Sequence, residues 1–171
     1  MTKCSPTARR ATRASTLRDG LLLTVLLPVL ASAADVTASQ ASKIVEGCSA
    51  HAKSRSQSHA IVVVDTGGHV VASLRMDGNS YGIAEFARRK AEAVAGWRFS
   101  TEQMQEAARQ TPGFGDAPGV VTVAGGLPVF TPEGEFIGAV GVSGESPADD
   151  AACAEAGIRA AGLASTRPKR Q

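Results

Sequence analysis

The chain has 171 residues, which is enough for one domain with its own hydrophobic core. It contains 18 basic and 16 acidic residues, but five basic residues and one acidic residue lie within the first 33 positions. The remainder carries 13 basic and 15 acidic residues, so its composition gives no support to a nucleic-acid-binding protein.

The first part of the chain has the three regions of a secretory signal peptide. Basic residues are spread over Met1–Asp19, an apolar run covers Gly20–Leu30, and Ala31-Ser32-Ala33 provides the small residues of a cleavage site. The apolar run is about half the length of roughly twenty residues that a membrane span requires. We therefore predict an exported protein, periplasmic or secreted; the Arg9-Arg10 pair leaves general and twin-arginine export both open.

Three segments follow from this interpretation. We predict a signal peptide at 1–33, one folded domain at 34–165 and a basic disordered tail at 166–171. We expect no membrane span in the mature form.

Two cysteines, Cys48 and Cys153, remain after removal of the signal peptide. In an exported protein such a pair can form a disulfide, but two buried thiols on the inner faces of helices fit the sequence equally well. The absence of CxxC and Cys/His clusters from the sequence argues against a zinc site.

The pattern of the mature chain predicts alternating helical and extended blocks. Apolar residues at helical spacing predict four helices, which begin after the capping residues Thr37, Ser80, Ser100 and Ser146. Runs of β-prone residues predict five strands, at Ala60–Asp65, Val70–Met76, Val120–Ala124, Leu127–Phe130 and Phe136–Val142. Tight turns at Thr66–His69 and Pro132–Gly134 make the strands they join antiparallel, with Leu127–Phe130 at a sheet edge because Pro128 lacks an N–H.

The predicted order is therefore α–ββ–αα–βββ–α, an α/β (α+β) arrangement in which helices pack on a mainly antiparallel sheet. This order is not that of a doubly wound nucleotide-binding fold, and the sequence contains neither a GxGxxG motif nor a P-loop. The loop Thr111–Gly119, with two prolines and three glycines, is predicted to be a flexible connection or a lid.

Several motifs in this order resemble the GlcG/HbpS family of haem-binding proteins, which includes the C-terminal domain of PduO-type proteins. They are Val63–His69, Arg75–Gly78, Arg89–Ala91, Gly125–Val129, Gly138–Gly144, and Asp149-Asp150 ahead of Ala156-Gly157. The resemblance spans about Thr37–Leu163 and implies a profilin-like fold. It also implies a homo-oligomer, in many members an octamer, and haem as the cofactor, bound through a histidine.

The sequence offers three histidines as axial ligands for haem iron. His51 lies near the end of the first helix, His59 at the mouth of the first strand and His69 at the hairpin tip. The resemblance favours His51, because some haem-binding relatives use a histidine of the first helix; a solvated surface role is the alternative for each. Backbone N–H groups of Gly141, Ser143 and Gly144, at a corner ahead of the last helix, are candidates for binding an anionic group.

A small-molecule enzyme is the alternative function. Arg75 and Asp77 leave the second strand together, and Lys90 lies on an otherwise apolar helix face. A partly buried lysine with a lowered pKa can act as a base, and an arginine can hold a carboxylate, which fits isomerase or lyase chemistry. The structural alternative is a turn-closing ion pair and a lysine that reaches past the core.

A third hypothesis has no ligand at all. Small residues along Gly134–Gly144 and on the last helix allow close subunit packing, as in an oligomeric accessory protein.

Overall fold

The computed structural model describes residues 34–169, and the predicted signal peptide lies outside this part of the chain. The elements in chain order are α1 (Ala38–Ser54), β1 (Ala60–Val64), β2 (Val70–Arg75), α2 (Tyr81–Trp97), α3 (Thr101–Gln110), η1 (Phe114–Asp116), β3 (Gly126–Phe130), β4 (Phe136–Ser143) and α4 (Pro147–Ala160). Among these residues, no helix combines the length and the apolar character needed to cross a membrane.

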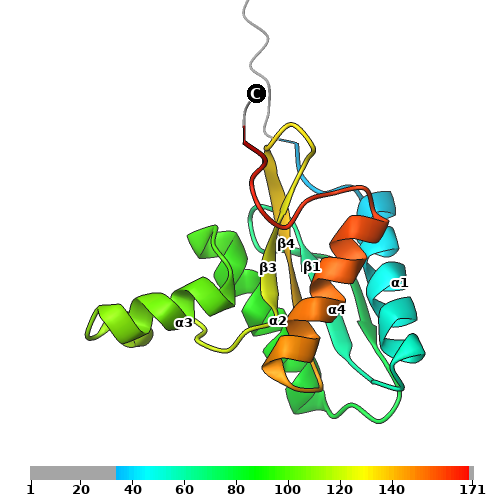
Figure 1. Cartoon of the computed structure of the whole chain (residues 1–171), viewed down its shortest axis with the longest axis horizontal. Helices are drawn as coiled ribbons and strands as arrows, with labels where there is room; N and C mark the ends of the chain where they lie inside the picture. Colours follow the sequence, from blue (N-terminus) through cyan, green and yellow to red (C-terminus); the bar gives the residue numbers. More distant parts are fainter. Residues whose placement is uncertain (1–33, 170–171) are drawn as a thin grey trace, which may run out of the picture. The chain divides into compact units, whose positions relative to one another are not determined.

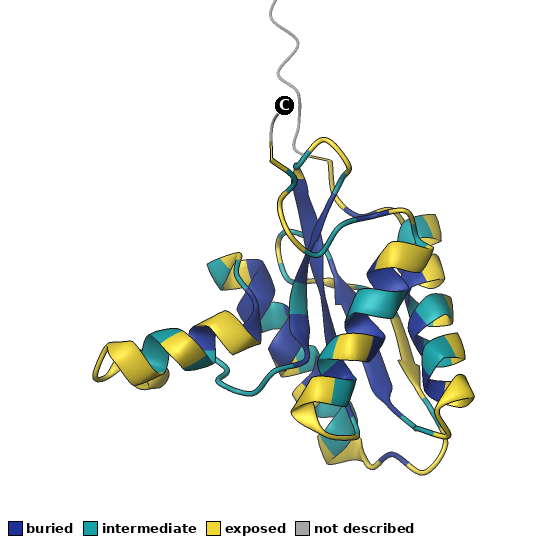
Figure 2. Cartoon of the chain, viewed as in Figure 1, coloured by how far each residue is buried: buried dark blue, intermediate teal, exposed yellow. Residues whose placement is uncertain are grey.

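Helices α1 and α4 cover one face of the sheet and α2 covers the other (Figure 1). The sheet is antiparallel throughout, with the strand order β2-β1-β4-β3. The two central strands are buried along their whole length (Figure 2), as expected for strands covered on both faces. The predicted mixed α/β class, the four helices and the edge position of β3 are confirmed.

The prediction of about five strands was wrong by one, because the described residues form a four-stranded sheet. Val120–Ala124, predicted as a strand, is an irregular connection whose residues are only half-buried. Val120 and Val121 pack against the core beneath α2 without pairing with any strand of the sheet. A β-prone run becomes a strand only where a neighbouring strand can satisfy its backbone, and this run has none. The loop before it contains one short 3-10 turn, η1.

The helices begin where their capping residues predict. Thr37 and Ser100 form complete capping boxes with Gln40 and Gln103, and Ser146 accepts a hydrogen bond from the Asp149 N–H. These bonds satisfy N–H groups that have no partner within the helix, so each cap fixes the residue at which its helix begins.

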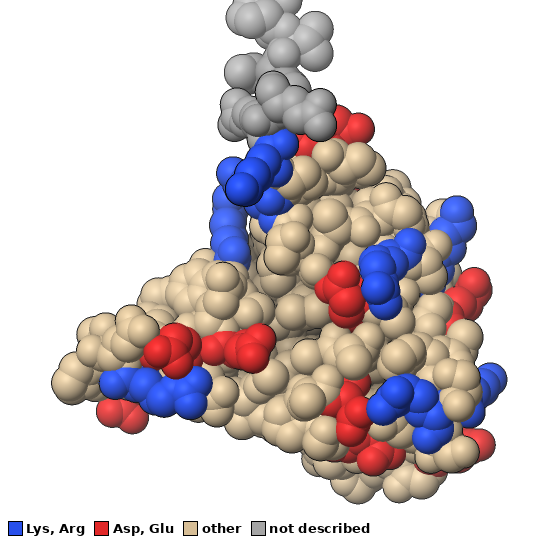
Figure 3. Space-filling view, viewed as in Figure 1, with Lys and Arg blue, Asp and Glu red and all other residues tan. Residues whose placement is uncertain are grey.

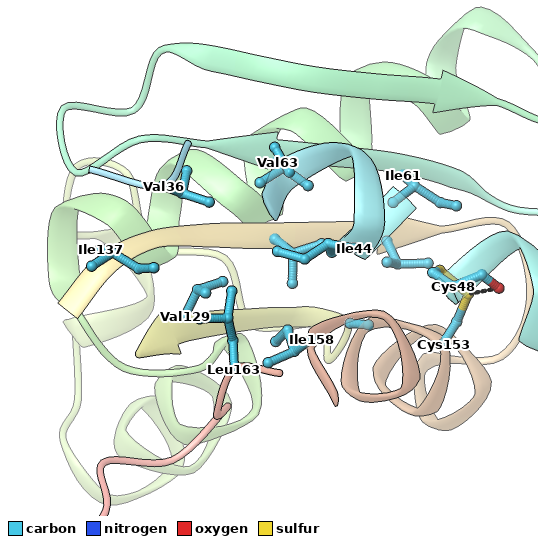
Figure 4. Packing of buried hydrophobic residues seen from close by; sticks show 14 of the residues in the cluster. Val36, Ile44, Cys48, Ile61, Val63, Val129, Ile137, Cys153, Ile158 and Leu163 are labelled. Atoms are coloured by element: carbon cyan, nitrogen blue, oxygen red, sulfur yellow. Dashed lines mark hydrogen bonds between the residues drawn. A yellow bond between two sulfur atoms is a disulfide. The ribbon is translucent and has the colours of Figure 1, made fainter. Parts of the chain in front are cut away.

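Alternate residues of the central strands point into two separate hydrophobic cores, one on each face of the sheet. Ile61 and Val63 of β1 point toward α1 and α4, whereas Val62 and Val64 pack against α2. Ile44 of α1 lies in the middle of the first core (Figure 4).

A disulfide between Cys48 and Cys153 joins α1 to α4 at one end of the first core (Figure 4). Both cysteines are fully buried and the closed loop spans 105 residues. Of the two interpretations that the sequence left open, the structure contains the bridge.

Candidate functional site

Three ionisable side chains from different elements meet in the interior. Lys90 of α2, Asp150 of α4 and His59 at the start of β1 are all buried, with relative exposures of 0%, 2% and 0%. Lys90 Nζ lies 2.9 Å from Asp150 Oδ2, and His59 Nδ1 lies 3.1 Å from Asp150 Oδ1. The Asp150 carboxylate therefore connects α4, on one face of the sheet, to α2 on the other face, at the end of the sheet where β1 begins.

Lys90 has further partners in this network. Its Nζ donates to the Val142 carbonyl oxygen at 2.9 Å and lies 4.9 Å from the centre of the Phe86 ring. Burial lowers the pKa of Lys90, while the hydrogen bond and the charge of Asp150 act in the opposite direction. Gly125 makes room for the ammonium group, since a Cβ at that position would lie 2.8 Å from Lys90 Nζ.

Only one of the two ring nitrogens of His59 takes part in this network. Because Asp150 accepts, the hydrogen lies on Nδ1, and Nε2 is buried with no hydrogen-bond partner among residues 34–169.

The position for an anion at the glycine-rich corner ahead of α4 is occupied by the Asp150 carboxylate of the same chain. The backbone N–H of Glu145 donates to Asp150 Oδ1 at 3.2 Å, which is the contact that an external anion would make there. Gly144, at φ 150°, has no room for a side chain because a Cβ would contact the Ser58 carbonyl oxygen. Gly141 and Ser143 belong to β4, and Gly141 lies directly against the backbone of Ala87 in α2.

The three residues proposed for an enzyme lie in different surroundings. Arg75 and Asp77 are exposed and together line a surface cleft of about 410 Å³ that does not include Lys90. Arg75 donates to the backbone oxygen of Asn79, and the Asp77 backbone oxygen accepts from Ser58. Lys90, in contrast, is sealed in the interior with Asp150, so the structure does not bring the three together.

His51 lies in the last turn of α1, half-buried, and its Nε2 is covered and has no partner in the described chain. It is one helical turn from Gly47, where a Cβ would clash with Ala160 of α4, so His51 lies on the flank of α1 that faces α4. The disulfide begins at Cys48, on the same part of α1, and prevents the two helices from separating there.

His69 is the histidine that is open to solvent, with its side chain 83% exposed. Its Nδ1 lies 3.2 Å from both carboxylate oxygens of Asp65. The other ring nitrogen, Nε2, is not engaged by this carboxylate. Asp65 also accepts the backbone N–H groups of Gly67 and His69, at 2.9 Å each. These hydrogen bonds, first of all the one from the His69 backbone, lower the pKa of Asp65.

An apolar groove begins at Val70, the residue after His69. It has a volume of about 200 Å³ and lies between β2 and α2, with Val70, Leu74 and Tyr81 exposed by 50%, 38% and 80%. Arg75, at the other end of β2 from Val70, is also among its lining residues. Within residues 34–169, no group of three or more His, Cys, Asp or Glu side chains is arranged to hold a metal ion directly.

An antiparallel sheet between two helical layers, tied together by an internal lysine–aspartate–histidine network, defines a small mixed α/β domain. The sequence model of the family described as haem degrading protein HbpS-like matches residues 36–159. The chain therefore belongs to the HbpS-like family.

Relatives agree with this assignment. Protein GlcG of Escherichia coli strain K12 is 36% identical over 104 residues, which are 60% of this chain and 77% of that protein. A crystal structure of HbpS is similar with a TM-score of 0.69 and 29% identity, covering 77% of this chain and 93% of the HbpS chain. A crystal structure of a PduOC:heme complex has a TM-score of 0.71 at 20% identity, covering 78% of this chain and 99% of that one, and this likeness concerns the fold.

The sequence analysis identified His69, Lys90 and the glycine corner as candidate site residues. It did not predict that Lys90 contacts Asp150 or that Asp150 contacts His59. One signal was available: a lysine among apolar residues on the buried face of a helix needs a carboxylate within reach. Which carboxylate it meets depends on how α4 packs on the face of the sheet opposite α2.

Proposed function

We propose that the protein is exported and binds haem, with His69 as the axial ligand of the iron. Membership of the HbpS-like family supports a haem-related function. The observation that carries the ligand assignment is the Asp65–His69 pair, in which a carboxylate holds Nδ1 and Nε2 is left to solvent. Such a carboxylate fixes the tautomer and the ring orientation of a metal-binding imidazole.

The surroundings of His69 also meet the other needs of a haem site. Haem requires apolar surface for the ring and cations or N–H groups for its propionates. The groove that starts at Val70 offers the apolar surface, and Arg75, which lines the groove at the other end of β2, offers a cation. Haem bound here would supply the iron chemistry, while the chain supplies the ligand, the apolar wall and the charge.

His51, favoured by the resemblance alone, fits less well. Its Nε2 is covered on the flank of α1 that faces α4, and the Cys48–Cys153 bridge holds this flank closed. His59 is fully buried and engaged with Asp150. We do not propose isomerase or lyase chemistry, because Lys90 is inaccessible and separate from the cleft of Arg75 and Asp77.

The test is a haem titration of residues 34–171, followed by absorbance. We expect a saturable spectral change that is lost in His69→Ala and retained in His51→Ala and His59→Ala. Asp65→Asn keeps the ligand but weakens its orientation, so we expect about a tenfold to hundredfold loss of affinity. A change that survives in His69→Ala and disappears in His51→Ala would overturn the ligand assignment, and a change independent of all three histidines would overturn the haem site.

Export and assembly are parts of the same proposal. Mass spectrometry of the protein from a cell fractionation should find a mature N-terminus near Ala34 outside the cytoplasm. Light scattering of the mature chain should give the mass of at least two protomers. Finding only full-length monomer in the cytoplasm would refute both.

A further inference from the structure

A further hollow, with no histidine in its lining, lies at the end of the sheet where β3 turns into β4. It has a volume of about 710 Å³, against about 200 Å³ for the groove beside β2. Its walls come from the end of α2, the turn between β3 and β4, and the C-terminal segment. These segments are far apart in sequence, so the hollow is a product of the fold.

Two arginines of this hollow lie over aromatic rings. The Arg98 guanidinium lies 5.3 Å from the centre of the Phe136 ring, and that of Arg167 lies 5.5 Å from the centre of the Phe130 ring. The two rings pack edge to face at 5.8 Å and are buried, so they are a fixed support. A guanidinium group in such a cation–π contact keeps its charge and its N–H donors, so each arginine can still pair with a carboxylate.

Neither arginine has a carboxylate partner within the part of the chain that the structure describes. Glu133 and Glu135 line the same hollow, and these two acidic side chains are also unpaired within residues 34–169. Figure 3 shows basic side chains gathered at the top of the view, and acidic side chains beside them near the tip of the hairpin. Charges of both signs therefore face one space without neutralising each other.

The hollow is built by specific contacts of the backbone. Phe130 and Ala164 exchange two backbone hydrogen bonds, of 2.8 and 3.0 Å, which anchor the C-terminal segment to the edge of the sheet. Gly134, at φ 89°, brings the turn close to Arg167, since a Cβ there would lie 3.5 Å from the Arg167 side chain. Arg98 has the left-handed backbone conformation with φ 63°, which is unfavourable for a residue with a side chain. The fold maintains this arrangement against a local cost.

We propose that this hollow binds a zwitterionic ligand of the amino-acid or short-peptide class. Its carboxylate pairs with Arg98 and Arg167, and its ammonium group pairs with Glu133 and Glu135. A ligand with both charges satisfies all four side chains, whereas a simple anion would leave the two carboxylates facing it. The inference does not depend on haem binding, because no histidine contributes to the site.

Triglycine is the probe, added to isotope-labelled residues 34–171 and followed by NMR chemical-shift changes. We expect saturable shifts in the β3–β4 turn and in the segment around Arg167. N-acetyl-triglycine lacks the ammonium group and triglycine amide lacks the carboxylate, so each should bind at least about tenfold more weakly, as expected for the loss of a charge-assisted hydrogen bond.

Charge-neutral variants test which side chains hold each end. Arg98→Gln with Arg167→Gln should abolish binding of triglycine, and Glu133→Gln with Glu135→Gln should remove the preference for triglycine over its N-acetyl form. Arg159→Gln, an exposed arginine of α4 outside the hollow, is the matched control and should bind as the unaltered chain does. All these side chains are on the surface, so the variants should fold.

Two results would overturn the proposal. One is the absence of saturable shifts at the turn with triglycine. The other is equal binding of triglycine, N-acetyl-triglycine and succinate, which would show a site for carboxylates alone.

Discussion

Replacement of Lys90 by methionine tests the central network most directly. The methionine has a similar length and keeps the apolar part of the side chain, but it removes the ammonium group from a site with 0% exposure. Asp150 then stays buried without its strongest partner, and the Val142 carbonyl oxygen loses the Nζ donor at 2.9 Å. Breaking a buried ion pair costs about 3–5 kcal/mol of unfolding free energy.

The structure places the expected loss at the lower end of that range. Asp150 still accepts from the Glu145 N–H at 3.2 Å and from His59 Nδ1 at 3.1 Å after the change. These two donors keep part of the carboxylate's hydrogen bonding, so we expect Lys90→Met to lower the unfolding free energy by about 3 kcal/mol.

The assay is urea unfolding followed by circular dichroism, at one protein concentration because oligomers gain stability by mass action. Arg89→Met is the matched control: it lies next in the same helix, its side chain is 61% exposed, and it pairs with Glu85 and Glu92. Exposed pairs of this kind contribute about 0–1 kcal/mol.

A double-mutant cycle with Asp150→Asn then isolates the pair. We expect a coupling energy of about 1–3 kcal/mol between positions 90 and 150. The reasoning would be refuted if Lys90→Met cost no more than Arg89→Met, or if the two changes at 90 and 150 were simply additive.

Three further changes probe packing, the disulfide and acid stability. Gly141→Ala should lower the unfolding free energy by at least about 1–3 kcal/mol in urea unfolding, since its Cβ would enter the backbone of α2, whereas Gly96→Ala in the open part of that helix should be neutral or stabilising. Loss of the bridge in Cys48→Ala with Cys153→Ala should cost about 2–5 kcal/mol, and the unfolded mature protein should show no free thiol with a thiol reagent. Asp65 has a folded-state pKa below its ordinary 3.8, so its contribution is complete above pH 3.8 and disappears as the pH falls through the folded value. The difference in unfolding free energy between the unaltered chain and Asp65→Asn should therefore shrink in that acid range, and a constant difference would contradict the assigned hydrogen bonds.

Local signals in the sequence were sufficient for most of the fold. Capping residues such as Ser100 fix where helices start because they supply the first hydrogen bonds, and these depend on neighbours only three residues away. The continuous apolar runs at β1 and β4 predicted the two central strands, since strands covered on both faces need apolar residues at every position. The error at Val120–Ala124 has the opposite cause, because strand pairing depends on distant residues.

The candidate sites were harder to predict because their members come from separate parts of the chain. Asp150 fits the ordinary pattern of an acidic residue in the first turn of a helix, and nothing local to it indicates that Lys90 lies 2.9 Å away. The pair at Asp65 and His69 is local, four residues apart across a tight turn, and was within reach of the sequence. The sequence offered His69 as a ligand, but only the structure showed that its Nδ1 is held by Asp65 and that the Nε2 of His51 is covered.

The position of Asp150 decides where a ligand can bind in this domain. A helix N-terminus behind a glycine-rich corner attracts anions, and here the chain's own carboxylate occupies that position while Lys90 neutralises it. A ligand anion at the corner would have to displace a buried, fully paired carboxylate, which costs several kcal/mol. Binding is therefore expected at the periphery, at the exposed His69 and in the hollow beside Arg98. Substitutions of His69 and Arg98 should change binding with little effect on stability, whereas substitutions at Lys90 should change stability first.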